Sequence, residues 1–177
     1  MSAVNALKTI LVDDVIIPLT KEKSKNCCVL SEAKANYSYE IHSVPDDMLV
    51  IHCDKFPDTG KFFKGKNNEC KRADYVLISD SERAIMIFEL IKSNSKSAGK
   101  VTDQLKGAKC ILDYCESISL EFLGKNDIFV DYTYRYYKVV STMAKKRAFS
   151  EYERTENTKP ELHKKLSGSF ARFEWLL

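Results

Sequence analysis

Two acidic residues stand at matching ends of two neighbouring apolar runs in the sequence. Asp74 lies at the start of "ADYVLI", and Glu89 lies near the end of "AIMIFELI". The five residues "SDSER" between the runs suit a hairpin loop, which places the start of the first strand beside the end of the second. Two carboxylates held close together repel each other unless a cation or a shared proton compensates. The pair therefore predicts a site for Mg²⁺ or Mn²⁺, which prefer oxygen ligands.

Further polar residues extend this group along the chain. An ammonium group at Lys92 would stabilise charge that develops on a phosphate or help to activate a metal-bound water. Gln104 falls in the first turns of the next predicted helix, where phosphate is favoured. The predicted nucleic-acid contacts flank the acidic pair on both sides and are Lys64, Lys66, Lys71, Arg72, Lys96 and Lys100. An acidic metal centre within a basic rim is what phosphodiester hydrolysis requires, because the rim attracts the polyanion.

The elements that position these residues follow from the apolar pattern. Residues 73–78 and 84–91 are almost continuously apolar, which predicts central strands covered on both faces. Residues 100–123 repeat apolar side chains at helical spacing, and Gly124 is a suitable helix stop. Residues 128–140 alternate in polarity and predict a long strand with one apolar face.

The rest of the chain predicts smaller elements around this centre. We expect a helix over 5–18, a hairpin over 27–44 and a strand over 48–56. Residues 144–165 are polar and basic and predict a surface excursion, after which 169–177 return as an edge strand. Together the elements indicate the α/β class, with a mixed central sheet flanked by helices.

The length of 177 residues predicts a single domain over 1–177. Its core covers about 48–140, with the helix and hairpin of 5–44 before it and the basic part of 144–177 after it. The net charge of +3 is too small to indicate a nucleic-acid partner by itself.

The composition also indicates the cellular compartment of the protein. No apolar run approaches the length of a membrane span, and two aspartates interrupt the first apolar segment, so neither a membrane protein nor a signal peptide is expected. The six cysteines form no CxxC pair and predict reduced thiols rather than a zinc site. We expect a cytoplasmic protein.

The order "ADYVLI … IFELIK … DQL" resembles the PD-(D/E)xK nuclease superfamily, which has the restriction-endonuclease-like fold. In that family an aspartate opens the second core strand, a (D/E)xK signature closes the third, and a helix with a glutamine follows. The matching positions are Asp74, Glu89, Lys92 and Gln104. The resemblance implies cleavage of DNA, less often RNA, with Mg²⁺ or Mn²⁺ held by Asp74, Glu89 and the carbonyl of Leu90. It also implies a setting such as bacterial or antiviral phage defence.

One residue too many separates the acid from the lysine. The family signature has a single residue between them, whereas Leu90 and Ile91 lie between Glu89 and Lys92. Strand side chains alternate, so Lys92 would point away from Glu89 unless a β-bulge turns it back. The alternative function is therefore a non-catalytic nuclease-like module that binds nucleic acid or a partner protein.

Two further questions stay open at this stage. An acid upstream of Asp74 often completes such sites, and the candidates are Glu69, Glu32 and Glu40. The expected partner is nucleic acid, with a homodimer or a partner ATPase or helicase as further alternatives. The chain has no GxxxxGK[ST] phosphate loop, so a nucleotide-driven motor would have to be a separate protein.

Overall fold

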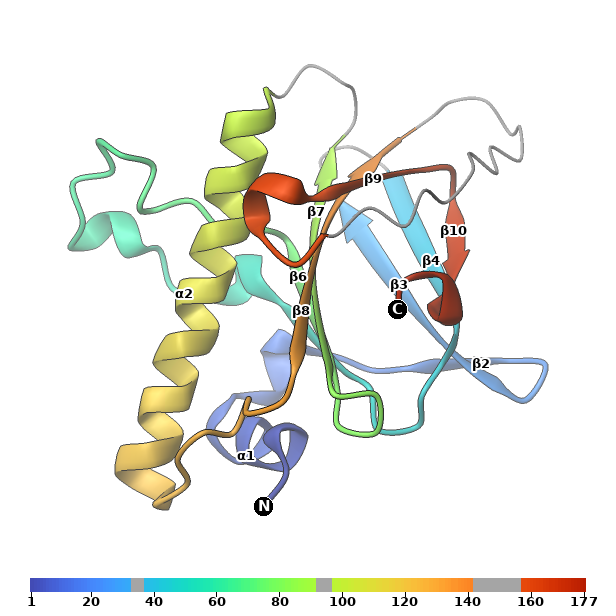
Figure 1. Cartoon of the computed structure of the whole chain (residues 1–177), viewed down its shortest axis with the longest axis horizontal. Coiled ribbons are helices and arrows are strands. Elements are labelled where there is room, and N and C mark those ends of the chain that lie inside the picture. Colours follow the sequence, from blue (N-terminus) through green and yellow to red (C-terminus); the bar gives the residue numbers. More distant parts are fainter. Residues whose placement is uncertain (33–36, 92–96, 142–156) are drawn as a thin grey trace.

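The computed structural model describes residues 1–32, 37–91, 97–141 and 157–177 of the chain. These residues form two β-sheets and two α-helices, stacked in three layers with the larger sheet in the middle (Figure 1). The strand order of the larger sheet is β1 (Ile16–Ile17), β5 (Leu49–His52), β6 (Tyr75–Ser79), β7 (Ala84–Ile91), β8 (Thr133–Val140) and β9 (Lys164–Ser167). The order of the smaller sheet is β10 (Phe170–Arg172), β4 (Tyr37–Val44), β3 (Lys25–Glu32) and β2 (Thr20–Glu22). The helices are α1 (Ala3–Ile10) and α2 (Ala98–Leu123).

Both sheets are mixed, which confirms the prediction of a mixed α/β protein. Strands β7, β8 and β9 run parallel, whereas β1, β5, β6 and β7 are joined by antiparallel pairing. The parallel neighbours β7 and β8 are connected through α2, because parallel strands need a crossover connection. In the described part of the chain, α1 and α2 both lie on one face of the larger sheet, and the smaller sheet covers the other (Figure 1). A restriction-endonuclease-like core stays a prediction.

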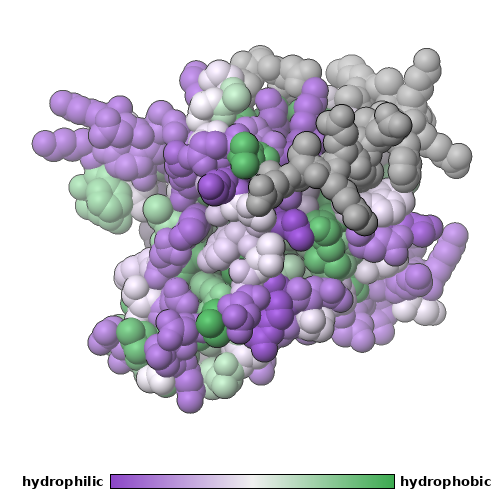
Figure 2. Space-filling model, in the orientation of Figure 1, coloured by the Kyte–Doolittle hydropathy of each residue, from purple (hydrophilic) through white to green (hydrophobic). Residues whose placement is uncertain are grey.

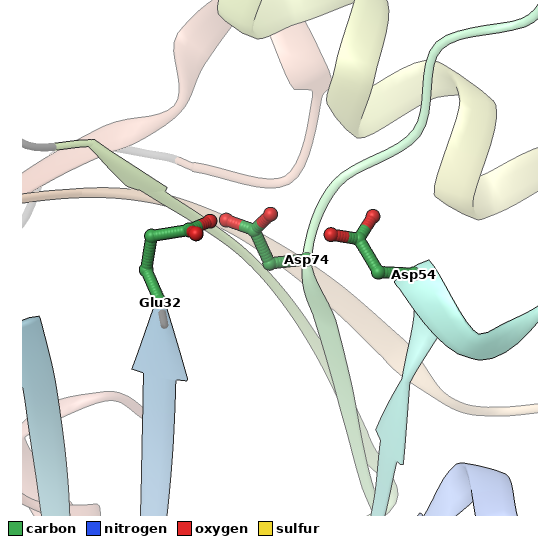
Figure 3. Close-up of side chains that lie close together, drawn as sticks. All are labelled: Glu32, Asp54 and Asp74. Carbon is green, nitrogen blue, oxygen red and sulfur yellow. The ribbon is translucent and has the colours of Figure 1, made fainter. Parts of the chain in front are cut away.

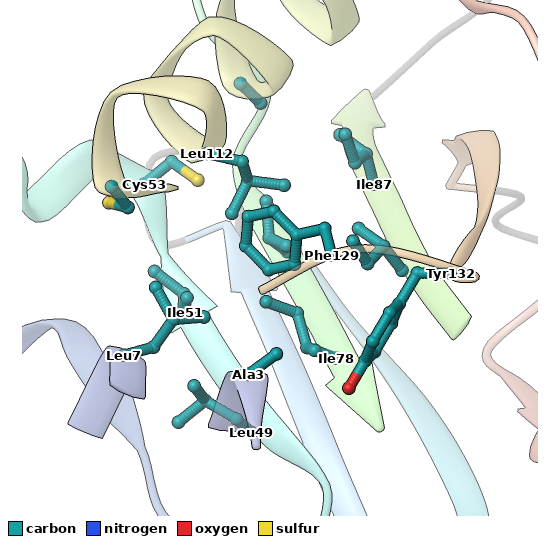
Figure 4. Close-up of a cluster of buried hydrophobic side chains, with 14 of the residues drawn as sticks. Ala3, Leu7, Leu49, Ile51, Cys53, Ile78, Ile87, Leu112, Phe129 and Tyr132 are labelled. Carbon is teal, nitrogen blue, oxygen red and sulfur yellow. The ribbon is translucent and has the colours of Figure 1, made fainter. Parts of the chain in front are cut away.

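Two apolar clusters occupy the spaces between the three layers. The first lies between the helices and the larger sheet and includes Leu7, Ile51, Ile78, Ile87 and Leu112 (Figure 4). The second lies between the two sheets and includes Leu30, Ile41, Leu77, Phe88 and Tyr137. Successive residues of β6 and β7 enter opposite clusters, so the predicted burial of both faces is confirmed.

Both helices begin and end for local reasons. In α1, the Ser2 hydroxyl caps the first turn by accepting from the Asn5 N–H at 3.4 Å. The helix ends at Ile10, so the predicted helix over 5–18 is wrong beyond that residue. Ile16 and Ile17 instead pair with β5 as an edge strand. In α2, Gly124 is left-handed with φ 61° and ψ 32°, which confirms it as the stop. No helix within the described ranges has both the length and the apolar character needed to cross a bilayer.

The strand predicted over 128–140 begins only at Thr133. Asp127 and Asp131 have positive φ angles of 51° and 64°, so the chain turns where the alternation pattern continues. Val130, expected on the apolar face, is 56% exposed as a result. The expectation of one apolar face was also too simple, because Tyr136 enters the first cluster and Tyr137 the second.

The remaining predicted elements have mixed outcomes. The hairpin over 27–44 is confirmed as β3 and β4, although its turn at 33–36 lies outside the described residues. The strand over 48–56 ends at His52 and continues as a 3₁₀ turn, Cys53–Lys55. Within the predicted excursion over 144–165, residues 144–156 lie outside the described residues, but Lys164 and Lys165 belong to β9. The predicted C-terminal edge strand over 169–177 is confirmed only for β10, which pairs with β4, because the chain continues as a 3₁₀ turn, Phe173–Trp175.

Helix α2 is in direct contact with the chain segment that leads into Asp74. A Cβ atom added at Gly107 would lie 1.7 Å from the carbonyl oxygen of Lys71, so only glycine allows this approach. One turn earlier, the Gln104 amide donates to the carbonyl of Arg72 at 3.4 Å. The helix therefore sets the position of the backbone two residues before Asp74.

This contact predicts opposite effects for two glycines of the same helix. Gly107→Ala should lower the free energy of unfolding by roughly 1–3 kcal/mol, because the methyl group overlaps the Lys71 carbonyl. Gly99→Ala, which meets nothing within 4 Å, should raise it by up to about 1 kcal/mol. Urea denaturation measures both changes, and equal stability of the two variants would contradict the contact.

Candidate metal centre

Three carboxylates from separate parts of the sequence meet at one end of the two sheets. Glu32 is the last residue of β3, Asp54 belongs to the 3₁₀ turn after β5, and Asp74 directly precedes β6. One carboxylate oxygen from each residue lies within 4.8 Å of those from the other two. Figure 3 shows the three side chains pointing toward a common region. Among the described residues, these three form the group of acidic, histidine or cysteine side chains with spacing suited to a metal ion.

The spacing suits a small divalent cation. Two oxygens bound to one Mg²⁺ ion lie at most about 4.2 Å apart, given metal–oxygen distances of about 2.1 Å. Modest side-chain rotation would therefore bring the three oxygens into one coordination sphere. Asp74 is buried, Glu32 is half-buried and Asp54 is exposed, so the cluster is open to solvent on one side. An all-oxygen donor set with open positions fits Mg²⁺ or Mn²⁺.

Tyr75 holds the three acidic segments together. Its hydroxyl accepts from the Ser31 N–H at 3.0 Å and donates to the Ser31 carbonyl at 2.8 Å, which positions the residue before Glu32. Its ring stacks on His52 at a centroid distance of 4.6 Å, two residues before Asp54. Tyr75 itself follows Asp74 directly. One aromatic side chain thus links all three carboxylate-bearing segments.

A backbone contact adds to this arrangement. The N–H of Cys53 donates to the carbonyl of Asp74 at 2.8 Å. Cys53 is the first residue of the 3₁₀ turn that carries Asp54, so this turn is hydrogen-bonded directly to the backbone of Asp74. The relative positions of Asp54 and Asp74 are therefore set by main-chain atoms and do not depend on flexible side chains.

Asp74 lies in an electrostatic environment that opposes its ionisation. Burial, followed by the neighbouring Glu89 carboxylate, raises the pKa of Asp74 to about 8. The Leu90 N–H, which donates to the Asp74 carboxylate at 2.6 Å, acts in the opposite direction. Asp54 and Glu32 raise the pKa further. A divalent cation would offset the mutual repulsion of these groups and favour the ionised form.

The hairpin brings the predicted pair together as expected. Strands β6 and β7 pair Tyr75 with Phe88, so the residues next to them, Asp74 and Glu89, adjoin at the same end. Glu89 is fully buried, and it is not part of the three-carboxylate group. The metal-binding roles of Glu89 and of the Leu90 carbonyl stay predictions, while the Leu90 N–H has the additional role of contacting Asp74.

The predicted basic residues divide into four sets. Lys71 and Lys100, together with Asn68 and Gln104, line a cavity of about 320 Å³ at the start of α2. Lys64 and Lys66 are exposed on the loop that precedes Asp74. The guanidinium of Arg72 donates to the carbonyls of Phe56 and Pro57 at 2.6 and 2.9 Å, so it also closes the base of that loop. Lys92 and Lys96 lie outside the described residues.

Geometry distinguishes among the three upstream acids left open by the sequence. Glu32 reaches Asp74, as described above. Glu69 accepts from the Asn67 N–H at 2.7 Å in the exposed loop, and Glu40 lies 3.2 Å from the His42 ring. Asp54 was missed by sequence reasoning, and the signal available was an acid directly after the apolar run that forms β5.

Lys138 is a second residue that sequence reasoning missed. The parallel register of β7 and β8 pairs Lys138 with Glu89. The neighbours of each residue along its strand enter the inter-sheet cluster, so both side chains belong to the helix-facing side. Lys138 therefore adds a cationic residue beside Glu89 from the adjacent strand.

The residues that resemble the PD-(D/E)xK signature are thus partly described by the structure. Asp74, Glu89 and Gln104 lie around the end of the β6–β7 hairpin, and Lys92 is outside the described residues. No family model, curated protein or solved structure matches this chain. Membership of that superfamily stays a prediction.

The raised pKa of Asp74 predicts how stability depends on pH without metal. In the unfolded chain this carboxyl loses its proton near pH 3.8, whereas in the folded protein it keeps the proton to about pH 8. Between these values only the unfolded state ionises, so rising pH favours unfolding. At pH 8 in EDTA, the free energy of unfolding of Asp74→Asn should therefore exceed that of the wild type by about 1–3 kcal/mol. This difference should vanish below pH 4.

Urea titrations across that pH range measure this effect. Glu121→Gln, which changes an exposed carboxylate of α2, serves as the control and should follow the wild type. A pH slope of stability that is unchanged in Asp74→Asn would show that the buried carboxyl does not carry the effect.

Thermal stability in the presence of Mn²⁺ tests the three-carboxylate cluster. At an ion concentration a hundred times its dissociation constant, the melting temperature of the wild type should rise by about 5–10 °C. Glu32→Gln and Asp54→Asn should largely abolish that rise, because each removes one charged ligand. Glu69→Gln keeps the acceptor for the Asn67 N–H and should retain the rise. If Glu32→Gln and Asp54→Asn retained the rise and Glu69→Gln abolished it, the ion would bind outside the three-carboxylate cluster.

Proposed function

We propose that this chain is a divalent-metal-dependent nuclease that hydrolyses phosphodiester bonds in nucleic acid, with DNA favoured over RNA. The observations that carry the proposal are the convergence of Glu32, Asp54 and Asp74 and a lysine-lined cavity at the chain segment that leads into Asp74. Phosphodiester chemistry needs a cation to offset charge at the reacting phosphate and basic groups to hold the rest of the backbone. The resemblance to the PD-(D/E)xK superfamily and its restriction-endonuclease-like core belongs to the same proposal.

The acidic residues have distinct roles in this proposal. Glu32, Asp54 and Asp74 would hold Mg²⁺ or Mn²⁺, with Glu89 and the Leu90 carbonyl completing the set. The ion, when bound, would act as a Lewis acid on a phosphate oxygen and lower the pKa of water. Asp74 is fixed for its role by the Leu90 N–H and by the backbone contact to Cys53.

The basic residues would bind the substrate backbone. Lys71 and Lys100 line the cavity at the start of α2, where the amides of Asn68 and Gln104 are also present. A phosphate there would lie near the chain segment that leads into Asp74, since Gln104 contacts the Arg72 carbonyl. Lys64 and Lys66 on the exposed loop, and Lys96 beyond the described residues, would add to the basic rim.

A lysine beside the acidic pair completes the proposed site. The family resemblance assigns this role to Lys92. Lys138 is a second candidate, because its register with Glu89 does not depend on the spacing between Glu89 and Lys92. Either ammonium group would stabilise negative charge that develops at the phosphate.

The extra residue between Glu89 and Lys92 favours a second candidate function. In that case the chain is a non-catalytic nuclease-like module that binds nucleic acid or a partner protein. A cytoplasmic location, a defence setting, homodimerisation and a partner ATPase or helicase rest on the family resemblance and composition, and they are proposals of the same kind.

Cleavage of labelled DNA and RNA with Mg²⁺ or Mn²⁺ tests the nuclease proposal. Asp74→Asn and Glu32→Gln should each lower the rate by about 100-fold or more, because loss of a ligand weakens charge stabilisation at the phosphate. EDTA should abolish cleavage, and the exposed-residue control Glu121→Gln should cleave as the wild type does. Oligonucleotide binding without any metal-dependent cleavage would instead support the non-catalytic module.

A further inference from the structure

Two phenylalanines are exposed on the loop that precedes the candidate metal centre. In the loop of residues 57–72, which we call the lysine loop, Phe62 is 70% exposed and Phe63 is 50% exposed. Figure 1 shows this loop projecting beyond α2, on the side of the helix away from the larger sheet. Adjacent aromatic rings that remain in water leave a large apolar surface uncovered, which is a common sign of a binding surface.

The lysine loop keeps its shape through contacts that do not involve the phenyl rings. The N–H groups of Phe62 and Phe63 both donate to the Thr59 carbonyl, at 3.1 and 3.0 Å. Further contacts that hold the loop are Asp58 with Gly60, Cys70 with the Phe63 carbonyl, Asn68 with Asp103, and Arg72 with Phe56 and Pro57. Among the described residues, the ring contact of each phenylalanine is with the other. The rings are therefore available to a ligand without loss of loop structure.

The geometry of the two rings leaves separate faces open. Their centroids are 4.5 Å apart and their planes are inclined by 53°, so the rings are tilted and do not form a closed stack. A flat aromatic ligand can therefore stack on the more exposed Phe62 ring without displacing Phe63. Nucleic-acid bases are flat aromatic groups of this kind.

The charge around the rings fits a polyanion. The lysine loop carries five basic residues, and these are Lys61, Lys64, Lys66, Lys71 and Arg72. Its two acids, Asp58 and Glu69, both accept backbone N–H groups within the loop. Hydrophilic side chains dominate this projecting part of the surface, with an apolar patch at its edge (Figure 2). Aromatic rings set among lysines combine base stacking with attraction of the phosphate backbone.

We propose that Phe62 and Phe63 form a base-stacking platform that selects single-stranded nucleic acid. Within a duplex the base faces are covered by their neighbours, so only unpaired bases can lie on the rings. The chain runs from this platform through Asn68 and Lys71, which line the cavity at α2, to Asp74. The strand bound on the platform would follow the same course to the metal centre, a step that rests on the proposed nuclease function.

Fluorescence anisotropy with labelled oligonucleotides in EDTA tests the platform without cleavage. The probes are a single strand of about 16 nucleotides and the duplex of the same sequence. The wild type should bind the single strand more tightly than the duplex. Phe62→Ala and Phe62→Leu should each weaken single-strand binding about tenfold, because both lose the aromatic face, whereas Phe62→Tyr should retain it. Phe122→Ala, which removes a phenylalanine that is 77% exposed in α2, should bind as the wild type does.

Three results would overturn the platform. These are wild-type affinity in Phe62→Leu, equal loss of single-strand and duplex binding in Phe62→Ala, and absence of single-strand binding in the wild type. Failure of the platform is separable from failure of the nuclease proposal, because binding is measured without metal and the Asp74→Asn cleavage assay does not depend on Phe62.

Discussion

The two hydrogen bonds between the Tyr75 hydroxyl and the backbone of Ser31 are the interaction on which the candidate site depends. Strand β2 pairs with β3 only as far as Cys27, which leaves the outer edge of β3 open at Ser31. Tyr75, from the neighbouring sheet, supplies the missing donor and acceptor there. The two sheets are thereby joined at the end where Glu32 and Asp74 lie, and stacking of the same ring on His52 brings in the turn that carries Asp54. This link brings Glu32 to the pair of Asp54 and Asp74, whose own proximity is set by the backbone contact between Cys53 and Asp74.

Repulsion among the clustered carboxylates destabilises the folded protein, and a bound cation would offset that repulsion. Burial and the Glu89 carboxylate raise the pKa of Asp74, so the metal-free protein loses stability as pH rises from about 3.8 to about 8, where the unfolded chain ionises this carboxyl and the folded protein does not. Functional sites commonly hold such unfavourable charge, and the surrounding structure compensates for it. Here the compensation comes from two apolar clusters that cover both faces of the β6–β7 hairpin, and from the close approach of Gly107 to the Lys71 carbonyl. The helix contact also joins the lysine loop to the same end of the protein.

Much of the fold could be predicted from the sequence because its strongest elements are local. The β6–β7 hairpin and α2 have continuous or periodic apolar patterns, and the left-handed Gly124 ends the helix. The predictions fail where tertiary contacts override local pattern. Ile16 and Ile17 leave the predicted helix to pair with β5, and the turn at Asp131 interrupts an alternating segment. The hairpin that forms most of the second sheet was predicted, but its packing on the face expected to carry helices depends on contacts between distant segments, which periodicity does not report.

The same division applies to the site. The sequence by itself determined that Asp74 and Glu89 adjoin, because a short hairpin between two apolar strands allows one arrangement of their ends. Only the tertiary structure selected Glu32 over Glu69 and Glu40, added Asp54, and set Lys138 in register with Glu89. These residues come from segments whose proximity depends on sheet order and on the side-chain bridge from Tyr75. Spacing along the chain carries no information about contacts of that kind, since their free energy arises between elements and not within them.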